Sequence, residues 1–156
     1  MAKFIYKLQN VLEIKLKMED QAKSAFGAAM ARLNEEEARL EKLKERRSEY
    51  EREGQKMREN VLNVMELRDN NRALENLKEQ IAAQEKQVAR ANREVELARQ
   101  KLTEAMQERK IQEKLKENKF EEFKQELNAA ESKEIDELVS YTYGERIKQN
   151  KAEGNA

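Results

Sequence analysis

The hydrophobic residues between positions 74 and 105 recur at alternating intervals of three and four residues. The series is Leu74, Leu77, Ile81, Gln84, Val88, Ala91, Val95, Ala98, Leu102 and Ala105, with Gln84 as its only polar member. This spacing is the a and d pattern of a coiled coil, in which each apolar side chain packs between residues of a facing helix. The pattern therefore predicts a long helix with one apolar seam and a partner helix that covers it.

The first half of the chain carries a second ladder, which is less regular. Its predicted inward positions are Phe4, Leu8, Val11, Lys15, Met18, Ala22, Ala25, Ala29, Leu33, Glu36, Leu40, Leu43, Arg47, Tyr50, Gly54, Met57, Val61 and Val64. Two consecutive four-residue steps around Ala29 form a stutter, which unwinds a supercoil locally. Glycine inside a helix costs about 1 kcal/mol relative to alanine. We therefore expect the first long helix, about 4–53, to break at Gly54, and a shorter helix to cover about 55–68.

The strongest turn signal is the sequence Asp-Asn-Asn at residues 69–71. Asp and Asn side chains compete for backbone hydrogen bonds and tolerate left-handed geometry, so they favour turns. Asn71 is also a candidate cap for the helix that follows. We expect a second long helix over about 72–141, whose seam continues less regularly through Ile111, Leu115, Phe120, Phe123 and Leu127. A frayed tail is expected over 142–156.

A turn near residue 70 divides the chain into nearly equal halves. This predicts an all-α fold, a single coiled-coil rod over residues 1–156. The rod would be a long antiparallel two-helix coiled-coil hairpin with a short helix and a turn near its tip. Charge supports the pairing: residues 1–18 hold four lysines against Glu13, a net of +3, and residues 121–137 hold seven acidic residues against two lysines, a net of −5. Exposed ion pairs are weak, so their main effect here is on register.

Composition excludes several classes of protein. The 156 residues include no proline, cysteine, histidine or tryptophan, and 41% are charged. Such charge often accompanies disorder, but the regular apolar spacing and the abundance of helix formers favour a helical rod. The formal net charge of zero argues against a nucleic-acid partner. No run of 18 apolar residues is present, so no transmembrane span is expected.

Similar reasoning predicts the cellular location and the activity of the protein. Lysines interrupt the first apolar stretch, so we expect no secretory signal and a cytoplasmic protein. Without histidine or cysteine there is no catalytic triad or zinc site of the usual kind. The four glycines do not form a phosphate-binding loop, and the Glu35-Glu36-Glu37 run is typical of a solvated helix face. We therefore expect no enzyme activity, cofactor or metal site.

Four places carry more apolar surface than a single seam uses. The first is the stretch over residues 4–18, and the second is the cluster Ile135, Leu138, Val139, Tyr141 and Tyr143. The predicted hairpin would set them side by side, either covered by end packing or free to dock on a partner or a membrane surface. The third is Tyr50, which is more consistent with a core role. The fourth is the group Leu67, Leu74 and Leu77 near the predicted turn.

Several short motifs resemble the FliJ family, the coiled-coil component of the bacterial flagellar export apparatus. The opening at residues 3–13, KFIYKLQNVLE, is similar to that family's N-terminal signature, and residues 131–138, ESKEIDEL, resemble its closing motif. RRSEY at 46–50 and LENLKEQI at 74–81 also fit its middle. The likeness extends over essentially the whole chain.

The resemblance implies a non-enzymatic stalk that inserts one end into the hexameric export ATPase (FliI-like). The other end would reach the export gate membrane protein (FlhA-like), and export chaperones are further implied partners. By the same resemblance the ATPase end would comprise Phe4, Leu8, Leu12, Leu138 and Tyr141. The gate region would comprise Leu43, Tyr50, Ala73, Leu77, Gln80 and Gln84. The protein would be a monomer in isolation and would work at the cytoplasmic face of the cell membrane as a peripheral protein.

Two alternatives remain open on the sequence. One is the related stalk of an injectisome-type secretion system, which neighbouring flagellar genes would exclude. The other is a purely structural dimeric coiled-coil spacer. That spacer predicts helices that continue through residues 69–71, whereas the hairpin predicts an elongated monomer.

Overall fold

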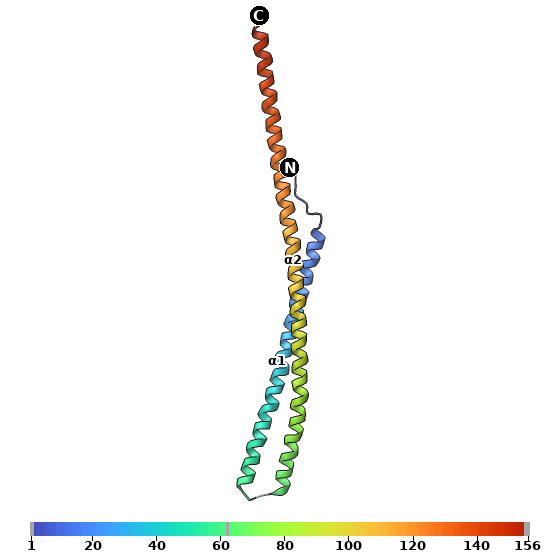
Figure 1. Ribbon diagram of the computed structural model, residues 1–156, viewed down its shortest axis with the longest axis vertical. Helices are drawn as coiled ribbons and strands as arrows, with labels where there is room; N and C mark the ends of the chain where they lie inside the picture. The colour runs from blue at the N-terminus through green and yellow to red at the C-terminus, as the bar shows by residue number, and fades with distance from the viewer. Residues whose placement is uncertain (1, 62, 155–156) are drawn as a thin grey trace. The chain divides into compact units, whose positions relative to one another are not determined.

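The computed structural model describes residues 2–61 and 63–154, and these form two long helices. Helix α1 spans Gln9–Glu59 and helix α2 spans Val64–Gly154. No strand occurs among the described residues, and the two helices pack against each other (Figure 1). The all-α helical hairpin predicted from the sequence is therefore confirmed.

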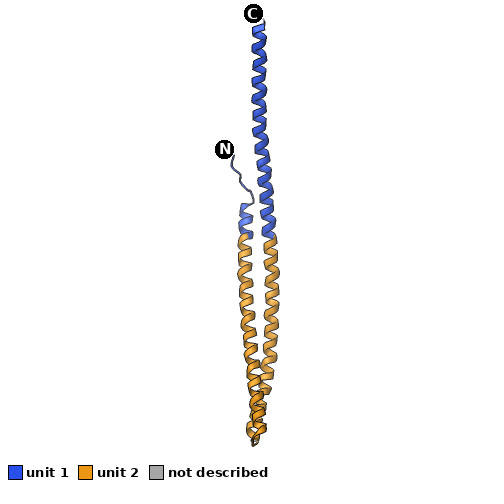
Figure 2. Cartoon of the chain, turned by 90° about the vertical axis from the view of Figure 1, so that its left-hand side faces the viewer, with its two compact units in different colours: residues 1–15, 108–156 blue, residues 16–107 orange. Residues whose placement is uncertain are grey.

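The chain divides into two compact units. Unit 2 holds residues 16–107 and unit 1 holds residues 1–15 with 108–156 (Figure 2). In unit 2 the helices run antiparallel, while in unit 1 the start of the chain packs on α2. The single domain over 1–156 stays a prediction, and its residues 1, 62, 155 and 156 lie outside the described part of the chain.

The core of unit 2 is the narrow seam that the α2 ladder predicts. Leu77, Ile81, Ala91, Val95, Ala98 and Ala105 are buried, and the other members of the predicted series are half-buried. Leu33 from α1 packs with Ala91 and Val95, and this cluster is extended by Phe26, Ala29, Met30 and Val88. Burial of these side chains supplies the main force that holds the two helices together.

Helix α1 keeps an unbroken heptad pattern, and the predicted stutter is wrong. Its buried and half-buried ladder is Leu12, Lys15, Glu19, Ala22, Phe26, Ala29, Leu33, Glu36, Leu40, Leu43, Arg47, Tyr50, Gly54 and Met57. Glu19 and Phe26 face inward in place of the predicted Met18 and Ala25. Met18 is 44% exposed, whereas Glu19 is 4% exposed and pairs with Lys23 at 3.5 Å. The three-and-four spacing then has no interruption.

The predicted break at Gly54 is also wrong, since α1 continues through it to Glu59. Gly54 is buried at the point where Asn70 of α2 comes closest. A Cβ atom on Gly54 would lie 2.8 Å from Oδ1 of Asn70. The amide Nδ2 of Asn70 donates a hydrogen bond to the carbonyl oxygen of Tyr50 at 2.9 Å. The absence of a side chain at Gly54 therefore leaves room for the buried amide of Asn70, and α1 has no break there.

The turn predicted at residues 69–71 lies inside α2, so that assignment and the separate helix over 55–68 are wrong. The chain instead passes from one helix to the other between Glu59, where α1 ends, and Val64, where α2 begins. Asn63 caps α2 because its Oδ1 accepts hydrogen bonds from the backbone N–H groups of Met65 at 3.1 Å and Glu66 at 3.4 Å. Asn70 contributes its hydrogen bond across the seam, which offsets its low helix propensity.

Helix α2 begins before and ends after the predicted range 72–141, and the inward positions near its middle differ from those predicted. Ile111 and Leu115 point outward and are 58% and 40% exposed. The inward ladder continues through Arg109, Gln112, Lys116, Phe123 and Leu127. The described part of the predicted frayed tail, 142–154, is helical as far as Gly154. Conversely, residues 4–8, predicted as helix, precede α1.

The Gly54 and Asn70 contact makes a testable prediction. We expect Gly54→Ala to lower the free energy of unfolding, because the gain in helix propensity of about 1 kcal/mol is outweighed by the contact with the hydrogen-bonded Asn70 amide. In an Asn70→Ala background the same change is expected to stabilise by up to about 1 kcal/mol. Urea unfolding of the four proteins checks this. Equal effects of Gly54→Ala in both backgrounds would contradict the explanation.

Candidate partner-binding surfaces

The position of the connection fixes which segments of α1 and α2 lie opposite each other. Nζ of Lys15 lies 2.9 Å from Oε2 of Glu108, and Nζ of Lys116 donates to Oε1 of Gln9 at 2.8 Å. A turn centred on residue 70 would instead have placed residue 15 opposite residue 125. The beginning of the chain therefore packs on an earlier part of α2 than the sequence predicts.

This register separates the two halves of the predicted ATPase end. The ring of Phe4 lies edge-on to Phe120, with centroids 5.2 Å apart, and 5.5 Å from the ring of Phe123. The predicted placement of the N-terminal stretch beside Leu138 and Tyr141 is therefore wrong. The physical reason is the early connection, which leaves α1 too short to cover the last part of α2.

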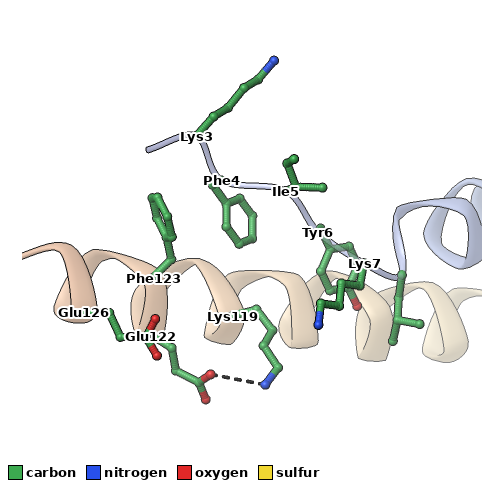
Figure 3. A pocket seen from close by; sticks show the side chains of 10 residues that line it. Lys3, Phe4, Ile5, Tyr6, Lys7, Lys119, Glu122, Phe123 and Glu126 are labelled. Atoms are coloured by element: carbon green, nitrogen blue, oxygen red, sulfur yellow. Dashed lines mark hydrogen bonds and ion pairs between the residues drawn. The ribbon is translucent and has the colours of Figure 1, made fainter. Parts of the chain in front are cut away.

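Residues 2–8, the N-terminal strap, precede α1 and run along α2, and residues 7 and 8 form the turn that leads into α1. Phe4 points toward the helix, while Lys3 and Ile5 point away from it (Figure 3). Tyr6 is 8% exposed, and its hydroxyl donates a hydrogen bond to Oε1 of Gln112 at 3.2 Å. The backbone N–H of Gln9 donates to the carbonyl of Tyr6 as α1 begins. Alternate side chains of the strap thus anchor it on α2.

The strap borders an open groove of about 560 Å³. Its walls are Lys3, Phe4, Ile5, Tyr6, Lys7, Leu8, Lys119, Glu122, Phe123 and Glu126. Lys119 is paired with Glu122 at 3.2 Å, and Nζ of Lys124 lies 4.7 Å above the Phe120 ring. Of the predicted residues here, Leu8 is 45% exposed and Leu12 only 5% exposed. Leu12 therefore packs inside unit 1 rather than facing a partner.

Residues 128–154, the C-terminal segment, form the most exposed part of α2. Every residue in this segment is exposed except Gly144, which is half-buried. Leu138 and Tyr141 are 65% and 66% exposed, and Ile135, Val139 and Tyr143 are exposed to a similar extent. Leu138 and Tyr141 border a shallow hollow together with Glu134 and Glu137. Within the described part of the chain, no helix faces this apolar strip (Figure 1).

All six residues predicted for the gate region belong to unit 2, and five of them are buried or half-buried. Leu77 is 5% exposed, Leu43, Tyr50 and Ala73 are half-buried, and Gln80 is exposed. Nε2 of the half-buried Gln84 donates to both the carbonyl oxygen and the carboxylate of Glu36. Gln80 is thus the member of this group that is open to a partner. The role of these six residues in binding an export gate stays a prediction.

The sequence reading missed an apolar patch beside the connection, which we call the loop patch. It consists of Val61, Val64 and Met65, which are 98%, 67% and 67% exposed. Met57, Asn60 and Asn63 border the adjoining groove. The signal was available in the sequence as the short apolar run that follows Asn60. The stronger turn signal at 69–71 concealed it.

The candidate chemistry of the described residues is limited to packing, hydrogen bonding and ion pairing. No group of three or more acidic side chains among them is arranged to hold a metal ion. Glu36, from the acidic run, is buried and hydrogen-bonded rather than presented to solvent. Neither helix, over its described residues, has a stretch both long and apolar enough to cross a bilayer.

Comparison with known proteins places this architecture in a family. A solved structure of a putative YscO homolog, CT670 from Chlamydia trachomatis, has a similar fold with a TM-score of 0.60 and 20% sequence identity. The match covers 90% of this chain and 96% of that one. A comparison with curated proteins gave no significant match. The family model described as flagellar FliJ protein matches residues 4–148. The chain therefore belongs to the FliJ family, structural components of flagellar protein export that are not known enzymes.

Proposed function

We propose that this protein is the non-enzymatic stalk of the flagellar type III export apparatus, and that its C-terminal segment inserts into the ring of the hexameric export ATPase. Membership of the FliJ family supports the export role. The observation that carries the choice of surface is the uncovered apolar strip around Leu138 and Tyr141. Exposed apolar strips of this kind mark protein interaction sites.

The N-terminal strap takes a supporting role in this proposal. Phe4 is engaged with Phe120 and Phe123, and Leu12 is buried, so neither is free to form the docking surface. Leu8, which is 45% exposed, lies at the edge of the groove. We expect the strap to hold the base of the C-terminal segment in place, while Leu138 and Tyr141 make the contacts with the ATPase.

The mechanism is a coupling between conformations rather than catalysis by this chain. A single helix has no sixfold symmetry, so its contacts with six identical ATPase subunits differ from one subunit to the next. Such differential contacts favour one subunit conformation over the others. Binding energy at Leu138 and Tyr141 thereby shifts the population of the catalytically competent state.

The second partner in this proposal is the export gate membrane protein. Because Leu77 is buried and Gln84 is hydrogen-bonded to Glu36, we assign the gate contact to exposed positions near them, above all Gln80 and the loop patch. The protein then acts in the cytoplasm and at the inner face of the membrane as a peripheral protein. Export chaperones are its remaining partners.

A stimulation assay tests the ATPase contact. We expect the Leu138→Ser/Tyr141→Ser double variant to reduce stimulation of the purified export ATPase by about tenfold, which corresponds to about 1.4 kcal/mol of lost binding. Both side chains are largely exposed, so the melting temperature should change little. The assay measures ATP hydrolysis by the full-length export ATPase of the same organism, with the unmodified chain or the double variant added.

The matched control removes a similar apolar area from the loop patch. Val64→Ser/Met65→Ser replaces two side chains that are each 67% exposed, and we expect it to leave stimulation intact but to impair flagellar secretion. Full stimulation by the Leu138/Tyr141 variant would overturn the proposed docking surface. Failure of the unmodified chain to bind any export ATPase would overturn the stalk function itself.

A further inference from the structure

The N-terminal strap has a second place available to it in the fold, as the first turns of α1. The inward residues of α1 recur at steps of three and four from Leu12 onward. The same steps, continued toward the start of the chain, give Leu8 and then Ile5. Both residues are apolar, yet in the strap they are 45% and 76% exposed. The heptad pattern of α1 therefore extends over residues that lie outside the helix.

The local sequence does not explain why α1 begins at Gln9. The strap has no serine, threonine, aspartate or asparagine that could cap a helix. It also has no glycine or proline that would interrupt one. The backbone N–H of Gln9 donates instead to the carbonyl oxygen of Tyr6, at 3.2 Å. Contacts between the strap and α2 therefore set the start of α1.

Two side chains hold the strap on α2. Phe4 packs on the rings of Phe120 and Phe123, and the buried Tyr6 donates its hydrogen bond to Gln112. The strap does not fill the surface beneath it, since a groove of about 560 Å³ stays open there (Figure 3). Burial of two aromatic side chains in the strap, or of two aliphatic ones in a longer α1, contributes comparable free energy. The two arrangements therefore compete.

We propose that the strap interconverts with a helical extension of α1, in which Ile5 and Leu8 replace Phe4 and Tyr6 on α2. Ile5 and Leu8 are three residues apart, so they share the inward face of the extension. Tyr6 follows Ile5 by one residue, about 100° around the helix and away from Leu8. Its side chain therefore leaves α2 for solvent. The strap exchanges one set of contacts for another and does not simply detach.

The contacts at the start of α1 show where the extension lies. Nζ of Lys116 donates to Oε1 of Gln9 at 2.8 Å, so these two residues lie opposite each other. In an antiparallel pair, each step back along α1 is matched by one step forward along α2. Ile5, four residues before Gln9, therefore comes opposite Lys119 and Phe120. The apolar stem of the lysine packs against Ile5 while its ammonium group stays in water.

The exchange uncovers an aromatic ring on the face of α2 that also carries the exposed apolar strip. Phe123 and Tyr141 are eighteen residues apart, which is about five helical turns, so they point the same way. A helix advances only about 1.5 Å per residue, so Phe4 in the extension stops short of Phe123. The strap thus controls how far the apolar face of α2 is open. This inference concerns the free chain and stands apart from the proposed ATPase contact.

Disulfide trapping in the full-length chain tests the helical extension, since the natural sequence has no cysteine. We expect Ile5→Cys/Lys119→Cys to form an intramolecular disulfide on mild oxidation, because the extension sets these positions opposite each other, within the span of a disulfide. In the strap, Ile5 points away from α2 (Figure 3). Absence of this disulfide would overturn the proposal.

The matched control distinguishes a helix from a loose strap. Lys7 would lie on the outer face of the extension, two residues from Ile5. We expect Phe4→Ala/Tyr6→Ala, which removes both anchors, to speed formation of the disulfide between positions 5 and 119 severalfold. The same change should not speed the disulfide of Lys7→Cys/Lys119→Cys. Equal acceleration of both would show a strap that detaches without forming a helix, and would overturn the proposal.

Dye binding tests the uncovering of Phe123. The oxidised Ile5→Cys/Lys119→Cys chain should bind severalfold more of the hydrophobic dye anilinonaphthalene sulfonate than the same chain in its reduced form. Adding Phe123→Ser should remove that difference, because the dye then loses the ring that the extension exposes. Equal dye binding by the oxidised and reduced chains would overturn the proposed control of this face by the strap.

Discussion

Replacing Val95 with aspartate is expected to lower the free energy of unfolding by about 3–5 kcal/mol, because it places an unpaired charge in an apolar seam. Val95 is 4% exposed and packs with Leu33 and Ala91 at the centre of unit 2. No cationic side chain belongs to this cluster. The carboxylate would either remain poorly solvated or force the helices apart. Urea unfolding followed by circular dichroism measures the effect.

The matched control introduces the same residue, aspartate, two positions away. Leu97 is 58% exposed on the outer face of α2, so we expect Leu97→Asp to cost less than about 1 kcal/mol, mostly through helix propensity. The two variants carry the same new charge and the same backbone preference. Equal losses of stability would mean that the seam does not face α1 at Val95.

The central part of α2 was predictable because nearly every inward position between 74 and 105 is apolar. Packing and local pattern agree there, and the structure buries or half-buries each predicted member of the series. Gln84 was the single exception, and its hydrogen bonds to Glu36 explain how the seam accommodates it. The structure of such a segment can be predicted from its sequence because local preference and tertiary packing agree.

The inward-facing residues in the first part of α1 were harder to predict, because this part has more apolar residues than inward positions. Met18 looked like a seam residue, but Glu19 takes that place and pairs with Lys23. A carboxylate can take a buried position when it is paired with a cation. Apolarity alone therefore chose the wrong neighbour at Met18, and the choice of Ala25 instead of the inward-facing Phe26 produced the false stutter near Ala29.

The connection was misplaced because local signals conflicted with a long-range contact. Asp69-Asn70-Asn71 has the composition of a turn, and Gly54 has the composition of a break. The structure uses Asn70 and Gly54 together, in one close contact between α1 and α2. Residues 16 positions apart in the chain can form such a contact only when the helices are antiparallel. Propensities of single residues carry no such information.

The candidate surfaces were affected by the same error. The sequence left open whether end packing covers the cluster at residues 135–143 or leaves it free, and the structure leaves it exposed. Its position beside Phe4 depended on the misplaced turn and on the net charges of the two ends. Those charges were a weak guide to register, because exposed pairs contribute little, and Lys15 in fact pairs with Glu108.

The buried polar pair between the helices gives the second large expected effect. We expect Gln84→Leu to cost about 2–3 kcal/mol, because it removes a hydrogen-bond donor from a buried carboxylate. Glu36 is 8% exposed and would keep Arg39, whose Nη1 lies 3.2 Å from Oε1 of Glu36. That remaining pair is at the rim, since the Arg39 side chain is 65% exposed. It offsets only part of the loss.

The double variant Glu36→Leu/Gln84→Leu should recover the lost stability, because a continuous apolar seam replaces the polar pair. It should also widen the range of alignments between α1 and α2, because a polar pair at one seam position selects a single alignment. Urea unfolding measures the first effect, and spin-label distances between positions 28 and 97 measure the second. Both positions are exposed, so the labels leave the seam intact. A narrow distance distribution identical to that of the unmodified protein would mean that packing at Leu33, Ala91 and Val95 fixes the register without the polar pair.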